Sequence, residues 1–124
     1  MAHLNALVVD DSPTMRKQLG YALQRVGVTT VEAVDGADAW RKLQAASFDI
    51  LFTDINMPLL DGLKLVALVR AGGRHQRIPI VVITAEAAEA DRRQAMSLGA
   101  SAYLVKPVQA PQGVETVRAL LRLG

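Results

Sequence analysis

Residues 4–13 read LNALVVDDSP, and this stretch decides the fold. The apolar run at 4–9 has the length and the composition of a strand buried on both faces of a parallel sheet. Two acids follow it, and Ser12-Pro13 then has the form of a helix start, because serine caps the first turn and proline suits its first position. The stretch therefore predicts a strand, an acidic turn and a helix in direct succession.

The same succession recurs along the chain. Further short apolar runs lie at residues 29–33, 50–53, 80–83 and 102–105. Helical patterns follow the runs, beginning at Pro13, after Gly36 and near Asp61, and then spanning roughly 87–98 and 111–123. This alternation predicts an α/β fold in which five parallel strands are joined by right-handed crossovers and covered by helices on both faces. For a chain of 124 residues we expect a single domain over 1–124.

The composition excludes several classes of function. The chain has no cysteine, which excludes disulfides, thiolate zinc sites and a cysteine nucleophile. With 14 Lys and Arg against 12 Asp and Glu, the net charge of +2 is too small for direct nucleic-acid binding by bulk charge. No apolar stretch reaches the ~18 residues of a membrane span, and the first residues lack the features of a secretion signal. We therefore expect a cytoplasmic protein with no nucleic-acid or membrane partner.

The residues best suited to chemistry follow the predicted strands. Ligands of such sheets bind outside the carboxyl ends of the strands, so these positions matter most. They are Asp10 and Asp11 after the first strand, Asp54 after the third, Thr84 and Ala85 after the fourth, and Lys106 after the fifth. Taken singly, each has an ordinary structural interpretation, such as a helix cap or a solvated surface charge. Together they indicate one site, because they all fall at the same edge of the predicted sheet.

The charges of this set predict a metal ion and a phosphoryl group. Two carboxylates ~4 Å apart repel by about 4 kcal/mol at an effective dielectric constant of about 20, so a cation must offset them. Mg²⁺, or Mn²⁺, prefers such oxygen ligands. The amine of Lys106 and the hydroxyl of Thr84 would then surround a phosphoryl group in transfer, with one carboxylate as the nucleophile. Without metal, the same repulsion predicts that alanine at Asp11 or at Asp54 raises the melting temperature.

The ordered set of strand-end residues resembles the CheY-like receiver domains of two-component response regulators, over nearly the whole chain. Neighbouring strings match as well: DINMP at 54–58, DG at 61–62, GASAY at 99–103 and VKP at 105–107. The strings SPTMR at 12–16 and TAEA at 84–87 are similar to stand-alone chemotaxis members in particular. The resemblance implies a flavodoxin-like (βα)5 three-layer sandwich whose strands lie in the order 2-1-3-4-5.

The resemblance also implies roles for the acids. Asp54 would accept a phosphoryl group from a phosphohistidine of a sensor histidine kinase or of a histidine phosphotransfer protein. Asp11, Asp54 and the backbone carbonyl of Asn56 would bind Mg²⁺, with Asp10 assisting through a water molecule. A protein of this kind is not a turnover enzyme, but it catalyses its own phosphorylation and dephosphorylation.

The remaining residues would bind the phosphate and couple phosphorylation to the shape of a partner-binding surface. Lys106 would pair with the phosphate, Thr84 would donate a hydrogen bond to it, and the backbone N–H of Ala85 would approach it. The peptide between Lys106 and Pro107 would be cis. Thr84 and Tyr103 would form the switch that couples the phosphate to a surface for a downstream protein.

That partner surface would be formed by helix 87–98, strand 102–105 and helix 111–123. Its candidate residues are Arg92, Arg93, Val105, Arg118 and Arg122. Because most of them are basic, we expect the downstream protein target to present an acidic docking segment.

Other classes of protein share parts of the pattern. A flavodoxin-like FMN carrier shares the architecture, but Asp10 and Asp11 would repel its phosphate. An aspartyl-phosphate phosphatase of the haloacid dehalogenase type needs a second acid two residues after its nucleophile, where this chain has Asn56. A receiver fold that docks to partners without being phosphorylated stays open as the main alternative, although the complete set of acids, threonine and lysine argues against it.

Overall fold

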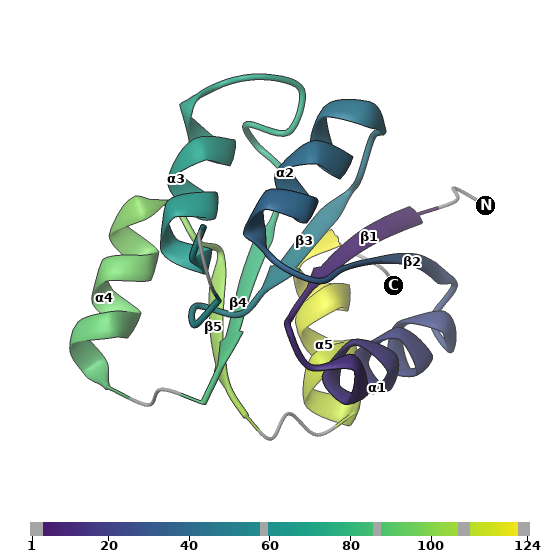
Figure 1. Cartoon of the computed structure of the whole chain (residues 1–124). Helices are drawn as coiled ribbons and strands as arrows, with labels where there is room; N and C mark the ends of the chain where they lie inside the picture. Colours follow the sequence, from purple (N-terminus) through teal and green to yellow (C-terminus); the bar gives the residue numbers. More distant parts are fainter. Residues whose placement is uncertain (1–3, 58–59, 86–87, 107–109, 122–124) are drawn as a thin grey trace.

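The computed structural model describes residues 4–57, 60–85, 88–106 and 110–121, and strands and helices alternate over these ranges (Figure 1). In chain order they are β1 Leu4–Val9, α1 Pro13–Gln24, β2 Val28–Ala33, α2 Gly36–Ala45, β3 Ile50–Thr53, α3 Gly62–Ala71, β4 Ile80–Thr84, α4 Glu89–Leu98, β5 Ala102–Val105 and α5 Ala110–Leu121. The predicted elements are confirmed, with small shifts at some ends. Thr84 was expected just after a strand and is instead the last residue of β4, where a β-branched side chain suits the extended backbone.

The strands of these ranges form one parallel sheet in the order β2-β1-β3-β4-β5. Helices α2, α3 and α4 pack on one face of the sheet, and α1 and α5 pack on the other (Figure 1). The predicted three-layer α/β fold and the strand order implied by the resemblance are both confirmed. In the described part of the chain, none of these helices combines the length and the apolar character that crossing a bilayer requires.

Side chains of the inner strands alternate between two hydrophobic cores, which explains why these strands are apolar at almost every position. In β1, Leu7 and Val9 face the core formed with α2, α3 and α4, whereas Ala6 and Val8 face the core formed with α1 and α5. All four side chains are at most 2% exposed. Burial on both faces, at about 25 cal/mol per Å² of apolar surface, is the main force that holds the sheet in the middle of the molecule.

The pairing of the strands brings the residues that follow them to one edge of the sheet. Backbone hydrogen bonds continue the pairing just beyond the strands, from the N–H of Asp10 to the oxygen of Ala33 (3.2 Å), from Asp54 to Val9 (3.1 Å) and from Lys106 to Thr84 (2.8 Å). The backbones of Asp10, Asp54 and Lys106 are therefore fixed relative to one another by the sheet itself.

A buried histidine lies near the opposite edge of the sheet. His75 precedes β4 and is 6% exposed. Its Nε2 accepts a hydrogen bond from the backbone N–H of Phe48 (3.0 Å), and the two rings lie 5.9 Å apart. A nitrogen that accepts a hydrogen bond carries no proton, so the imidazole is neutral. Burial lowers the pKa of His75 below its ordinary value of 6.5, and the positive charge of Arg74 lowers it further.

We expect mild acid to destabilise the protein through His75. Because its pKa is lowered in the folded chain, the unfolded chain takes up the proton first as the pH falls. The stability that the neutral histidine contributes is therefore complete above pH ~6.5 and is lost below it. Urea unfolding at about pH 7.5 and about pH 5.5 measures this loss. His75→Gln keeps an acceptor for the Phe48 N–H but cannot titrate, so its free energy of unfolding should change less. If the free energy of unfolding fell equally in the unaltered chain and in His75→Gln between the two pH values, His75 would not be the group responsible.

Candidate functional site

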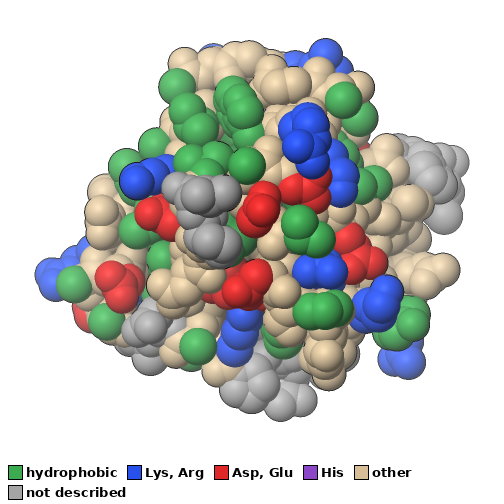
Figure 2. All heavy atoms as spheres, in the orientation of Figure 1, with side chains coloured by type: hydrophobic (Ala, Val, Ile, Leu, Met, Phe, Trp, Pro, Cys, Tyr) green, Lys and Arg blue, Asp and Glu red, His purple; other side chains and the backbone are tan. Residues whose placement is uncertain are grey.

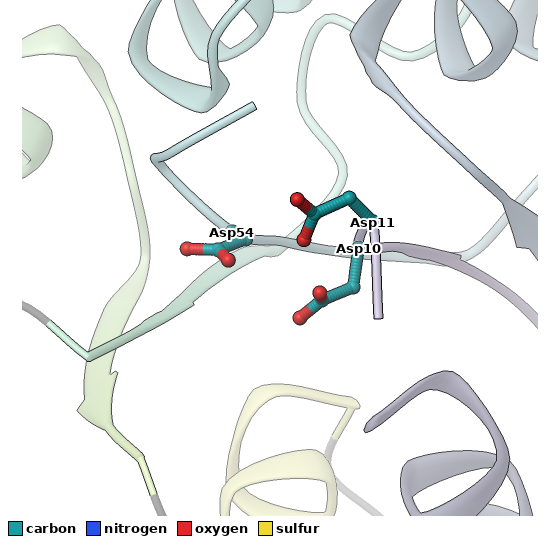
Figure 3. Close-up of side chains that lie close together, drawn as sticks. All are labelled: Asp10, Asp11 and Asp54. Atoms are coloured by element: carbon teal, nitrogen blue, oxygen red, sulfur yellow. The ribbon is translucent and has the colours of Figure 1, made fainter. Parts of the chain in front are cut away.

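Three carboxylates meet at the carboxyl edge of the sheet. Asp10, Asp11 and Asp54 each offer an oxygen atom, and these oxygens all lie within 4.8 Å of one another. The side chains come from the ends of β1 and β3 (Figure 3). Asp10 and Asp54 are buried, whereas Asp11 is exposed. In the space-filling view, acidic side chains gather near the middle of the visible face with basic side chains around them (Figure 2). The sequence-based prediction that these three acids converge agrees with this placement.

The backbone around Asp54 holds its carboxylate in one orientation. Oδ1 accepts hydrogen bonds from the N–H groups of Ile55 (2.7 Å) and Asn56 (3.3 Å). The hydroxyl of buried Thr53 donates to the carbonyl oxygen of Asp54 (3.0 Å). With Oδ1 engaged in this way, Oδ2 faces the ammonium of Lys106 at 2.9 Å.

Lys106 bridges two of the acids. Its Nζ lies 2.8 Å from Oδ2 of Asp10 and 2.9 Å from Oδ2 of Asp54, and its side chain is 18% exposed. Burial disfavours the charged ammonium, but the hydrogen bonds and the charges of the two carboxylates outweigh burial and raise the pKa of Lys106 above its ordinary value of 10.5. The lysine therefore stays charged at neutral pH and offsets part of the repulsion among the acids.

This bridge changes what is expected of Asp54 in the metal-free chain. Repulsion alone predicted that alanine at Asp54 would raise the melting temperature. In the structure, however, Asp54→Ala would also remove one of the two carboxylates that neutralise the ammonium of Lys106. Repulsion alone therefore no longer decides whether Asp54→Ala raises or lowers the melting temperature. At Asp11, which is exposed beside two other acids, the original argument still holds.

Asp11→Ala is accordingly expected to raise the melting temperature in EDTA, because it removes a like charge from the acidic cluster. The rise should shrink at high salt, since the charge is exposed. Millimolar Mg²⁺ should stabilise the unaltered chain by mass action and should stabilise the variant much less. Thermal unfolding in EDTA and in Mg²⁺ measures both effects. A lower melting temperature of the variant in EDTA would mean that the three acids do not strain one another.

The predicted phosphate-binding and switch residues lie on the neighbouring strands. Thr84 ends β4 and is fully buried, and Ala85 directly after it is exposed. Tyr103 is half-buried in β5, opposite Val82 of β4, and packs against the core on the side of α2, α3 and α4. In the sheet, β4 lies next to β3 and β5 lies next to β4. Thr84 and Lys106 therefore lie at the ends of the two strands that follow β3, both on the same side of Asp54.

The predicted partner surface is exposed where the structure describes it. Exposed side chains there are those of Arg92 and Arg93 in α4, Val105 in β5 and Arg118 in α5. Arg122 lies outside the described residues, as does Pro107 of the expected cis peptide. Arg92 pairs with Glu89 one turn earlier (3.3 Å), and an exposed pair of this kind contributes at most about 1 kcal/mol. On the described residues of these elements, Glu89, Asp91 and Glu115 balance Arg92, Arg93 and Arg118, so this surface is mixed in charge and not strongly basic.

Two features of the site were not predicted from the sequence. Arg16 of α1 donates a hydrogen bond to the backbone carbonyl oxygen of Asp10 (2.6 Å). Gly62, the first residue of α3, lies against the carbonyl oxygen of Asp54 so closely that a Cβ there would overlap it. Both residues belong to strings that carried the resemblance, SPTMR and DG, but the strings do not reveal that either residue contacts the backbone of an acid.

The fold and the site together define a class of protein: a parallel α/β sandwich with three acids and a lysine at the carboxyl edge of its sheet. Residues 6–118 match the response regulator receiver domain family. The chain belongs to this family, whose members are the receiver domains of two-component signalling.

Relatives of known name include chemotaxis proteins. The chain is similar to chemotaxis protein CheY1 of Helicobacter pylori strain J99, with 46% identity over 106 residues, which is 84% of this chain and 86% of that protein. It also matches the gliding motility regulatory protein of Myxococcus xanthus at 38% identity, over 83% of this chain but only 13% of that protein. Among solved structures, chemotaxis protein CheY4 of Vibrio cholerae has a TM-score of 0.90 at 32% identity, covering 96% of this chain and 99% of that chain. The resemblance to CheY-like receivers is confirmed.

Proposed function

We propose that Asp54 accepts a phosphoryl group from a phosphohistidine and thereby switches a surface that binds a partner protein. The observation that carries the proposal is the ion cluster, in which Lys106 lies within hydrogen-bond distance of Asp10 and Asp54 while Asp11 completes the set of three acids. Family membership supports it, because receiver domains are signalling proteins that carry out their own phosphorylation and dephosphorylation. CheY-like receivers also interact with histidine kinases and with downstream targets.

The donor set fits a hard divalent cation, and receiver domains bind Mg²⁺ in an acidic pocket. In this proposal Asp11, Asp54 and the backbone carbonyl of Asn56 hold Mg²⁺ or Mn²⁺, and Asp10 assists through water. The carboxylate of Asp10 also accepts from the N–H of Ser12 (2.8 Å) and pairs with Lys106, so it helps to hold the lysine at the site. When bound, the cation shields the incoming phosphate from the negative charge of the acids.

The transfer is a displacement at phosphorus. A carboxylate oxygen of Asp54 attacks, the P–O bond forms while the P–N bond to the donor histidine breaks, and the imidazole nitrogen keeps the electron pair. Lys106, the hydroxyl of Thr84 and the N–H of Ala85 donate hydrogen bonds to the oxygens of the moving group, so positive charge and donors lie where negative charge develops. Attack of water on the same phosphorus later restores the carboxylate.

The partner surface responds to the new charge. A phosphoryl group brings about two negative charges to a place where Lys106 already bridges two acids, so Lys106 must share its hydrogen bonds with the phosphate. Thr84 moves toward the phosphate, and Tyr103 moves inward with it. The surface of α4, β5 and α5 then changes shape, and a downstream protein binds there with an acidic segment beside Arg92, Arg93 and Arg118.

Incubation with acetyl phosphate and Mg²⁺ tests the acceptor. The intact chain should gain one phosphoryl group in its mass, EDTA should prevent the gain, and Asp54→Asn should abolish it. Asp61→Asn is the matched control, because Asp61 caps α3 through the N–H of Lys64 (2.9 Å) and asparagine caps equally well. Absence of labelling, or equal labelling of Asp54→Asn, would refute the proposal and favour a receiver fold that docks without phosphorylation.

A further inference from the structure

Arg16 is a partly buried cation at the acidic turn that the proposed chemistry does not use. It lies one turn into α1, and its side chain is 12% exposed. Nη1 donates to the carbonyl oxygen of Asp10 (2.6 Å) and Nε donates to Oε1 of Glu32 in β2 (2.8 Å). We infer that Arg16 is a positioning residue, which holds the turn at Asp10 and Asp11 in the shape that binds the divalent cation; the inference rests on the function proposed above.

Asp10 is held at each of its four polar atoms. Its N–H donates to Ala33 of β2 (3.2 Å), Oδ1 accepts from the N–H of Ser12 (2.8 Å), and Oδ2 pairs with Lys106 (2.8 Å). Arg16 supplies the partner for the fourth atom, the carbonyl oxygen. That oxygen belongs to the planar peptide that leads into Asp11. By fixing the plane, Arg16 sets the direction from which the exposed carboxylate of Asp11 projects.

Arg16 can do this because it is anchored itself. Glu32, the residue that anchors it, is tied at its backbone oxygen to Nζ of Lys42 in α2 (2.6 Å). The planar guanidinium holds two N–H donors in a fixed relative orientation and so satisfies both acceptors at once. A lysine ammonium at the same place lacks this fixed pair of donors. Lys17 also approaches Glu32 (3.7 Å), but its side chain is 61% exposed, so this contact is a weak surface pair and makes Lys17 a matched control.

Mn²⁺ binding tests the inference without any phosphorylation. It is measured as the decrease in the electron paramagnetic resonance signal of free Mn²⁺ when the protein is added. Arg16→Ala should weaken Mn²⁺ binding about tenfold, as loss of a partner behind a metal ligand typically does. Arg16→Lys should weaken it as well, and Lys17→Ala should leave it within about twofold of the unaltered chain. Simple electrostatics predicts the opposite sign for Arg16→Ala, because removing a positive charge beside the acids would tighten the binding of a cation.

Binding is measured at a temperature where the unfolding curve of each variant shows a folded chain, and Arg16→Lys serves if Arg16→Ala does not fold. An Arg16 variant that melts earlier but binds Mn²⁺ as tightly as the unaltered chain would overturn the inference, since a purely structural role predicts that result. If Arg16→Lys bound Mn²⁺ as tightly as the unaltered chain, the inference would also be overturned, since a positive charge alone would then be enough and the paired donors of the guanidinium would not be needed. Failure of the unaltered chain to bind Mn²⁺ would overturn the proposed metal site together with the inference.

Discussion

Replacement of Gly62 by alanine is expected to destabilise the protein by about 3 kcal/mol or more and to distort the acceptor site. Gly62 begins α3, and its N–H donates to the carbonyl oxygen of Ile55 (3.0 Å). A Cβ on Gly62 would overlap the carbonyl oxygen of Asp54, which is backbone and cannot rotate out of the way. The start of α3 would have to separate from the end of β3, and overpacking that forces the backbone to shift typically costs ~1–3 kcal/mol and occasionally more.

Urea denaturation measures the loss of stability, and acetyl phosphate labelling of the folded chain measures the effect on Asp54. Gly72→Ala is the matched control at the other end of the same helix. Gly72 has an extended backbone (φ 160°), and a Cβ there meets nothing within 4 Å, so its stability should change by less than about 0.5 kcal/mol. Equal stability of the two variants would show that α3 can move away from Asp54 at little cost.

The strands could be predicted from the sequence because burial on both faces leaves a clear signal. The run at 4–9 is apolar at nearly every position, and β1 has the bounds that were predicted. The order β2-β1-β3-β4-β5 came from the resemblance to receivers and not from the hydrophobic pattern. Such a pattern shows which residues are buried, but it does not show which strands are neighbours.

The acidic site could be predicted only as a set of side chains at one edge. Parallel strands all end at that edge, so the approach of Asp10, Asp11 and Asp54 followed from the fold class. The bridge made by Lys106 depends on strand register and side-chain rotamers, which the sequence does not express. The contacts of Arg16 and Gly62 were missed for a related reason. Arg16 and Gly62 both contact a backbone carbonyl oxygen. Every residue has such an oxygen, so the sequence does not indicate which one is contacted.

Lys106→Met is expected to cost about 3 kcal/mol of stability in EDTA, because it leaves the carboxylates of Asp10 and Asp54 buried without their cation. Methionine keeps most of the length and the apolar stem of lysine, so the loss reports on the charge. Mg²⁺ should then stabilise the variant more than the unaltered chain, since the ion no longer competes with an ammonium for Asp54. Labelling by acetyl phosphate should nevertheless fall, because the phosphate loses its lysine partner.

The same bridge fixes the direction of the alkaline pH dependence. The pKa of Lys106 is raised in the folded chain, so the bridge contributes fully below the ordinary value of 10.5 and its contribution is lost as the pH rises through the folded pKa. Urea unfolding at about pH 8 and about pH 11 should therefore show a fall in stability that is smaller in Lys106→Met. Lys64→Met, which changes an exposed lysine of α3, is the control and should cost less than about 0.5 kcal/mol. If Lys106→Met cost no more than this control in EDTA, the two buried carboxylates would have to tolerate each other without an ammonium, and the electrostatic argument for a bound cation would lose its basis.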